Sequence, residues 1–167
     1  MAADIAETLN WTKAMAATRT TKCDRKTGFS LVANHATRVL ILGTLPGSVS
    51  LARGEYYANP SNQFWRLLGP AIGRDLQGLG YDSRMQALLT SGIGLWDVVA
   101  SATRTGSLDS AIRAYDVNCL ETVLPRLPSL KALAFNGSKA FNIGRRLGGH
   151  ADFLLVPLPP AARLIVR

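Results

Sequence analysis

Apolar residues form four short continuous runs along the chain, and a glycine-containing or polar stretch follows the first three. The runs cover residues 38–42, 93–99, 130–135 and 153–157. Runs of this length that are rich in aliphatic residues are typical of strands buried on both faces of a parallel sheet. The pattern therefore predicts four strands in one mostly parallel sheet.

Helical spacing of apolar residues occurs between these runs. Phe64, Leu67, Leu68 and Ile72 predict a helix over 62–72, in which Asn62 is well placed as the N-cap. Further helices are expected at 81–90, 118–124 and 138–147, with a short one opening at 107–110 and a polar loop at 101–106. Strands that alternate with helices indicate a three-layer α/β/α sandwich with a small central four-stranded sheet.

The chain is predicted to hold one domain over residues 28–167. Residues 1–27 are rich in alanine, threonine and lysine, and we expect a poorly ordered arm with at most a short helix at 5–17. The amino terminus does not resemble a signal peptide, and no apolar run is long enough to cross a membrane, so we expect a cytoplasmic protein.

Composition and charge narrow the classes of function. Apolar residues make up 47% of the chain and charged residues 18%, which indicates a globular protein. The net charge of +8 is typical of a protein that binds a phosphate-rich partner, although a merely basic domain is an equally good interpretation of charge alone. The histidines and cysteines, His35, His150, Cys23 and Cys119, lack metal-ligand spacing, so we expect neither metal nor cofactor.

Polar and aromatic side chains follow each predicted strand. Because the carboxyl ends of parallel strands meet at one edge of the sheet, these side chains are expected to lie together there. They are amides, aromatics and cations, without a metal-ligand set or a nucleophile with its base, which suits recognition of a flat polar ring by stacking and amide contacts. They include Tyr56, Tyr57, Asn59, Asn62, Asp97, Ser101, Arg104, Asn136, Ser138 and Lys139.

Two segments around the first strand resemble a known family. Gly43-Thr44-Leu45-Pro46-Gly47 and Tyr56-Tyr57-Ala58-Asn59-Pro60, with Asn62 and Phe64-Trp65, are similar to motif one of the uracil-DNA glycosylase superfamily, in its hypoxanthine (deoxyinosine) DNA glycosylase branch. Residues 94–98, 106–110 and 135–140 are also similar to that branch, and the resemblance covers about 28–157.

The resemblance implies an enzyme that flips a deaminated base out of duplex DNA and hydrolyses its N-glycosidic bond without a cofactor. Asn62 would orient the attacking water, since this branch has no asparagine at the position of Leu45. Tyr57 would stack on the base, and double-stranded DNA would be the partner of a monomer. The remaining implied contacts are to the base from Gly43, Thr44, Leu45, Pro46, Gly47 and Asn136, and to DNA from Ser101, Arg104, Ser138, Lys139, Pro159 and Pro160.

Each of these residues also has a purely structural interpretation. Asn62 is a good helix cap, Tyr57 could fill the core, and Asn136 could mark a turn at a strand end. Arg104 and Lys139 are equally consistent with solvated charge and with phosphate contacts. Asp97 fits a structural acid that bonds loop amides better than it fits water activation.

The resemblance weakens at the carboxyl end. The family's second motif resembles Leu-Pro-Ser-Thr-Ser-Pro-Ala, whereas this chain has Leu158-Pro159-Pro160-Ala161-Ala162. Loss of the serine hydroxyls removes hydrogen bonds worth about 0.5–1.5 kcal/mol each. The sequence therefore leaves two alternatives to a glycosylase: a DNA-binding protein of the same fold without turnover, and a small-molecule-binding α/β domain whose charge is incidental.

Overall fold

A computed structural model describes residues 25–159 of the 167. The expected helix at 5–17, the rest of the arm up to residue 24, and Pro160 lie outside these described residues. Arg25–Thr27, which the sequence analysis placed in the arm, forms strand β1. The described part of the domain therefore begins three residues before the predicted boundary at residue 28, at the start of β1.

The centre of the molecule is a four-stranded parallel sheet in the order β3-β2-β6-β7. Its strands are β2 (Val39–Gly43), β3 (Ile93–Asp97), β6 (Ala132–Asn136) and β7 (Leu154–Leu158). Each lies within two residues of a predicted apolar run, because a strand covered on both faces needs apolar side chains at nearly every position. The expected fold class is confirmed.

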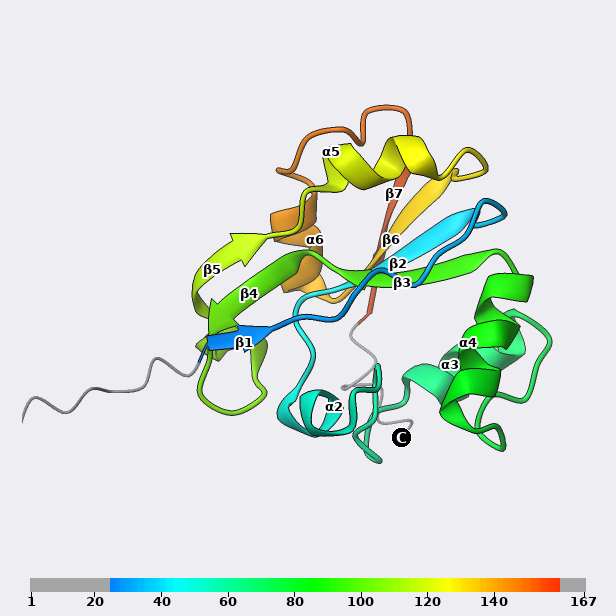
Figure 1. Ribbon diagram of the computed structural model, residues 1–167, viewed down its shortest axis with the longest axis horizontal. Coiled ribbons are helices and arrows are strands. Elements are labelled where there is room, and N and C mark those ends of the chain that lie inside the picture. The colour runs from blue at the N-terminus through cyan, green and yellow to red at the C-terminus, as the bar shows by residue number, and fades with distance from the viewer. Residues whose placement is uncertain (1–24, 160–167) are drawn as a thin grey trace, which may run out of the picture.

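Helices cover both faces of this sheet (Figure 1). Leu40 and Leu42 of β2 pack with α5 (Leu120–Val123) and α6 (Ser138–Gly144), whereas Ile41 between them packs with α3 (Phe64–Ala71) and α4 (Tyr81–Thr90). Successive side chains of a strand point to opposite faces, so one strand supplies both halves of the core. The remaining helical segments are α2 (Ser48–Arg53), η1 (Asp109–Ala111) and η2 (Leu124–Arg126).

A second sheet, which the sequence did not predict, joins β1, β4 (Val99–Thr103) and β5 (Arg113–Val117) in antiparallel order β1-β4-β5. Only Val98 separates β3 from β4, so the expected strand over 93–99 divides between the two sheets. The expected polar loop at 101–106 is therefore partly strand. Every residue of β5 is exposed, so this strand has no apolar stripe from which it could be predicted.

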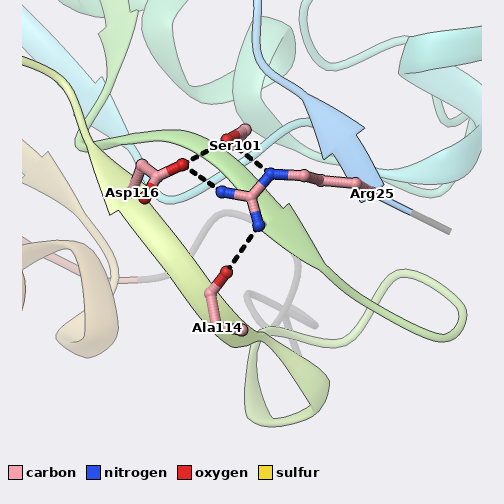
Figure 2. Close-up of polar contacts among 4 residues, drawn as sticks. All are labelled: Arg25, Ser101, Ala114 and Asp116. Atoms are coloured by element: carbon pink, nitrogen blue, oxygen red, sulfur yellow. Dashed lines mark hydrogen bonds and ion pairs between the residues drawn. The ribbon is translucent and has the colours of Figure 1, made fainter. Parts of the chain in front are cut away.

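The side chain of Arg25 connects β1 to β4 and β5 of the second sheet (Figure 2). Its guanidinium donates to the hydroxyl of Ser101 at 3.1 Å and to the carbonyl of Ala114 at 3.0 Å, and it pairs with the carboxylate of Asp116. The Ser101 hydroxyl in turn donates to Asp116 at 3.0 Å. Figure 2 shows the guanidinium spanning β4 to reach β5.

The β5 edge is irregular. Its pairing with β4 shifts register twice, between Val99 and Ser101 and again between Ser101 and Thr103. Ala114 has a φ of +43°, in the left-handed region that residues other than glycine seldom occupy. These shifts bend the outer strand of the second sheet away from a regular ladder.

Candidate active site

The loop after β2 lies at the carboxyl edge of the central sheet, against the ends of β3 and β6. Gly43 pairs with Asp97 across the parallel ladder, and Leu42 pairs with Phe135, one residue before Asn136. A Cβ atom on Gly43 would lie 2.6 Å from Oδ1 of Asp97 and 3.4 Å from the Tyr57 hydroxyl. Glycine is required here because the Asp97 carboxyl group leaves no space for a Cβ atom.

Asp97 is a buried carboxyl group at this edge, with 3% of its surface exposed. Burial is the main reason that its pKa rises to about 7, and Asp109 nearby raises it further. The neighbouring Tyr56 hydroxyl and the Arg104 guanidinium act in the opposite direction and lower the pKa of Asp97. Within the described chain, Oδ2 of Asp97 and the Tyr56 hydroxyl are both buried without a hydrogen-bond partner. The hydrogen-bonding capacity of these two buried atoms is therefore unsatisfied within the described chain.

Tyr57 links the loop to the end of β6. Its hydroxyl accepts a hydrogen bond from Nδ2 of Asn136 at 3.1 Å. Its ring stacks on Phe64 with a centroid separation of 3.7 Å and an interplanar angle of 15°. Because Phe64 covers one face of the ring, a ligand could stack only on the opposite face. Burial raises the pKa of the Tyr57 phenol, so it stays protonated at neutral pH.

The Tyr57 backbone adopts an unusual conformation. Its φ is +54°, which costs a bulky residue on the order of 1–3 kcal/mol. Such strain persists only where the surroundings impose it, and it occurs often at functional sites. Here the constraints are the ring stacking on Phe64 and the hydrogen bond to Asn136.

Asn62 lies just before helix α3, whose N-cap residue is Gln63. The side-chain Oδ1 of Asn62 accepts a hydrogen bond from the N–H of Phe64 at 2.9 Å, and its own N–H donates to the carbonyl of Asn59. The side chain is half-buried. The N-cap lies one residue later than predicted, at Gln63, whereas the Asn62 side chain closes a turn with Phe64 just before the helix. This bond leaves the amide NH₂ and one lone pair of Oδ1 for another partner. Through Phe64, Asn62 is connected to the ring of Tyr57 and so to Asn136.

Arg104 and Ser101 do not have the surroundings expected of phosphate contacts. Arg104 is 1% exposed, and its guanidinium donates to the carbonyl of Leu45 at 3.0 Å and to that of Pro46. Ser101 lies in β4, where its hydroxyl is bonded to Arg25 and Asp116. In this structure both side chains bind other parts of the protein, and their contact with DNA stays a prediction.

The remaining predicted contacts lie beside the same loop. Lys139 at the start of α6 donates to the carbonyl of Asp109 at 2.6 Å, and the Asp109 carboxylate accepts from Thr44 at 2.7 Å. Asp109 was not among the predicted site residues, although it lies in the stretch 106–110 that supports the resemblance. Ser138 and Pro159 are exposed.

An open cavity of about 600 Å³ occurs at the opposite edge of the sheet, lined by Arg38, Val39, Ile93 and Lys131 among others. These residues stand at the amino ends of the strands, away from Tyr57 and Asn136. In the described range 25–159, no three His, Cys, Asp or Glu side chains are grouped so that they could hold a metal ion. The helices in that range are too short or too polar to span a membrane.

Taken together, the carboxyl edge presents two amides, a protonated phenol, a buried carboxyl group and a glycine-bounded loop. Asn62 and Asn136 can orient a water or the polar edge of a ring, but they cannot remove a proton. Asp97 adds a buried carboxyl group whose pKa is raised to about 7. Such a set favours binding a neutral heterocycle and stabilising charge that develops on it.

Comparison with known proteins places this arrangement in context. The sequence model of the uracil DNA glycosylase superfamily matches residues 29–166. A hypoxanthine DNA glycosylase of Methanosarcina barkeri is 44% identical over 116 residues, which are 70% of this chain and 73% of the relative. One of Methanosarcina acetivorans is 43% identical over 115 residues, 69% and 73% of the two chains.

A solved structure is similar as well. The solution NMR structure of a proposed uracil DNA glycosylase from Methanosarcina acetivorans superimposes with a TM-score of 0.75 at 39% identity. The match covers 82% of this chain and 84% of that one. The similarity in structure therefore extends over most of both chains.

Proposed function

The chain belongs to the uracil DNA glycosylase superfamily, and we propose that it removes hypoxanthine from double-stranded DNA by hydrolysing the N-glycosidic bond. It would act as a monomer in the cytoplasm and without a cofactor. The observation that carries the proposal is the connection of Asn62, Tyr57 and Asn136 beside Gly43, in a chain 44% identical to a named hypoxanthine DNA glycosylase.

The reaction requires stabilisation of two opposite charges. As the bond between the sugar C1′ and the purine breaks, the sugar becomes oxocarbenium-like and the base acquires negative charge. The oxygen of water then adds to C1′, one proton of that water passes to the departing base or to solvent, and an abasic site remains. Donors that are fixed before the reaction lower the barrier because they need no reorganisation.

The residues at the carboxyl edge divide these tasks. The amide of Asn62 orients the water with the NH₂ group and the lone pair that its bond to the Phe64 N–H leaves unused. The sugar cation is a strong electrophile, so an oriented neutral water suffices. Tyr57 offers the ring face opposite Phe64 to the base, and Asn136 bonds the edge of the base while holding the Tyr57 hydroxyl.

The loop at Gly43-Thr44-Leu45-Pro46-Gly47 lies against the base through its backbone. Gly43 permits the close approach, because any larger residue would displace the Asp97 carboxyl. Lys139 and Ser138 at the start of α6 contact phosphates, and Pro159 after β7 reaches the duplex beside the flipped nucleotide. These roles are proposals that follow from position at the carboxyl edge.

A deoxyinosine duplex tests the proposal directly. The full chain is incubated with a labelled duplex that contains one deoxyinosine, then alkali cleaves any abasic site, and the free base is identified by mass. We expect strand cleavage at the deoxyinosine and release of hypoxanthine. A matched duplex with deoxyguanosine at that position should stay intact.

The same assay separates the alternatives. Salt-sensitive binding to the duplex without base release would indicate a DNA-binding protein that has lost turnover, consistent with the serines missing near Pro159. No binding at low salt, together with thermal stabilisation by a free nucleoside, would indicate a small-molecule-binding domain. Either result would contradict the proposed activity.

A further inference from the structure

Arg104 lies behind the loop that the proposed function assigns to the base. It is 1% exposed, and it follows β4, so it approaches the loop from the second sheet. One guanidinium nitrogen donates to the carbonyl of Leu45 at 3.0 Å and another to the carbonyl of Pro46. Its Nε is buried with no partner in the described chain. A buried cation therefore sits against two consecutive backbone carbonyls.

Burial lowers the pKa of Arg104, and the nearby carboxyl groups of Asp109 and Asp97 offset part of this effect. Arginine remains protonated in proteins because its ordinary pKa lies above about 12. The cation is therefore present at neutral pH.

Peptide geometry determines what this contact does to the other side of the loop. The described chain has no cis peptide bond, so each peptide C=O points opposite to the following N–H. Since the Pro46 carbonyl faces Arg104, the N–H of Gly47 points away from it. Within residues 25–159 that N–H has no hydrogen-bond acceptor, whereas the next N–H, of Ser48, donates to Ser107 at 2.9 Å.

We propose that Arg104 is a positioning residue for base release, an inference that rests on the proposed function. Its guanidinium holds the Leu45 and Pro46 carbonyls on its own side of the loop and so presents the Gly47 N–H to the departing base. Its charge also polarises the Pro46–Gly47 peptide, which makes that N–H a stronger donor as negative charge grows on the purine. Hydrogen bonds in series strengthen one another in this way in a low-dielectric interior.

Arginine suits this role better than lysine. Its planar fork can bond two carbonyls at fixed positions, whereas an ammonium group on a flexible stem acts as a single point charge. Replacing it tests two effects at once: the placement of the loop and the charge behind it. The two effects respond differently to the leaving-group ability of the base.

The experiment measures single-turnover base release from two duplexes that are identical except for the base. One contains deoxyinosine, and the other contains a ring-fluorinated hypoxanthine nucleotide, whose electron-poor base leaves more easily and needs less stabilisation. The variants are Arg104→Gln, which removes the charge, and Arg104→Lys, which keeps it. Arg113→Gln is the matched control. Arg113 also donates to backbone carbonyls, those of Ser110 and Ile112, but it does not donate to those of the loop at residues 43–47.

For Arg104→Gln we expect a loss of about 100-fold on deoxyinosine and only about 10-fold on the fluorinated analogue, since a stronger donor matters most for the poorer leaving group. Arg104→Lys should lose less than Arg104→Gln, again with the larger loss on deoxyinosine. Arg113→Gln should stay within about twofold of the parent on both substrates.

Equal losses on the two substrates would overturn the inference, because a merely structural role slows both alike. If thermal melting shows that Arg104→Gln does not fold, the ratio measured for Arg104→Lys decides in the same way. A parent protein that releases base from neither duplex would overturn the proposed function, and this inference with it. A parent that is active while the variants keep its substrate ratio would refute the role of Arg104 alone.

Discussion

Asn62 has a structural contact and a proposed role in the reaction. Its Oδ1 accepts from the N–H of Phe64 in the turn before α3, and the ring of Phe64 stacks on Tyr57. This hydrogen bond restricts the rotamer of the amide, so the NH₂ group is held in place before a substrate arrives. In the proposed reaction, preorganisation of this kind lets a neutral amide contribute to catalysis.

Substitution at Asn62 separates the two roles. Asn62→Ala should lower the free energy of unfolding by about 1 kcal/mol through loss of the hydrogen bond to the N–H of Phe64. Asn62→Ser should keep part of that stability, since a serine hydroxyl can accept the same bond more weakly. Both should slow release of hypoxanthine by about 100-fold or more, as loss of a single fixed donor does. The measurements are denaturant unfolding and single-turnover rates.

The Asn62→Ser variant shows whether the amide of Asn62 is needed for base release. If Asn62→Ser releases base at the parental rate, the amide is not needed and Asn62 only stabilises the turn before α3. If it is both stable and slow, the amide acts on the substrate or its water.

Asp97 makes stability depend on pH in an unusual direction. Its pKa rises from 3.8 to about 7 in the folded protein, mainly through burial. The native state therefore holds this proton at pH values where the unfolded chain has lost it. The stability that Asp97 contributes to the folded state is fully present below about pH 4 and is lost as the pH rises through about 7.

We expect the Asp97→Asn protein not to lose this stability as the pH rises. Parent and variant should differ in the pH slope of the unfolding free energy between about pH 4 and about pH 7, by up to about 4 kcal/mol across that range. Urea titrations at several pH values measure it, and the difference between the two proteins cancels the other acids. Parallel curves would show that Asp97 ionises normally in the folded state.

The site was predictable from sequence only in part. Gly43, Tyr57, Asn62 and Asn136 follow buried strands or open a helix, and the resemblance named them. The buried state of Arg104 could not be foreseen, because an arginine in a polar stretch looks like a surface residue. Its burial depends on β4 belonging to a second sheet.

At the scale of elements, α6 illustrates how closely the central sheet is covered. Gly144 is buried in this helix against the ring of Phe135 in β6. A Cβ atom at this position would overlap the ring, which is itself fully buried. The helix therefore accepts a poor helix former so that it can approach the sheet.

Gly144→Ala places two effects in opposition. Alanine raises helix propensity by about 1 kcal/mol. The overlap with Phe135 should cost about 1–3 kcal/mol, because a packed core yields little. We expect a net loss and a Tm lower by a few degrees, measured by thermal unfolding. Asn142→Ala, at an exposed position of the same helix, is the control and should be neutral or slightly stabilising.

The elements that were predicted share one property, which is burial on a definite face. The four strands of the central sheet and helices α3 and α4 have apolar patterns because each packs on the core. Strand β1 has three residues and β5 is exposed throughout, so neither carries such a pattern. Their pairing depends on contacts between distant residues, such as Arg25 with Asp116, which local sequence does not encode.

For the molecule as a whole, the net charge of +8 bears on the strength and the salt dependence of DNA binding. Each phosphate that the protein neutralises releases counterions, so affinity falls steeply as salt is added. If about six phosphates are contacted, affinity should fall by about 1,000-fold between about 50 mM and about 200 mM salt. Fluorescence anisotropy with a labelled duplex measures this slope.

Lys139 can be tested against the same slope. Lys139→Ala should reduce it by about one unit, because one phosphate contact is lost. Arg126→Ala is the control, since Arg126 precedes β6 and lies toward the amino ends of the strands. Equal slopes for Lys139→Ala and the parent would show that Lys139 serves only its bond to Asp109.

The irregular outer edge at β5 has a consequence for the behaviour of the protein in concentrated solution. A long, flat strand at the border of a sheet invites a strand of a second copy to extend the ladder, which is a common route to aggregation. Here the two register shifts and the left-handed backbone of Ala114 interrupt the row of donors and acceptors that a strand of a second copy would need in order to pair with β5. A regular β5 strand without these interruptions would therefore be expected to make the protein more prone to aggregation.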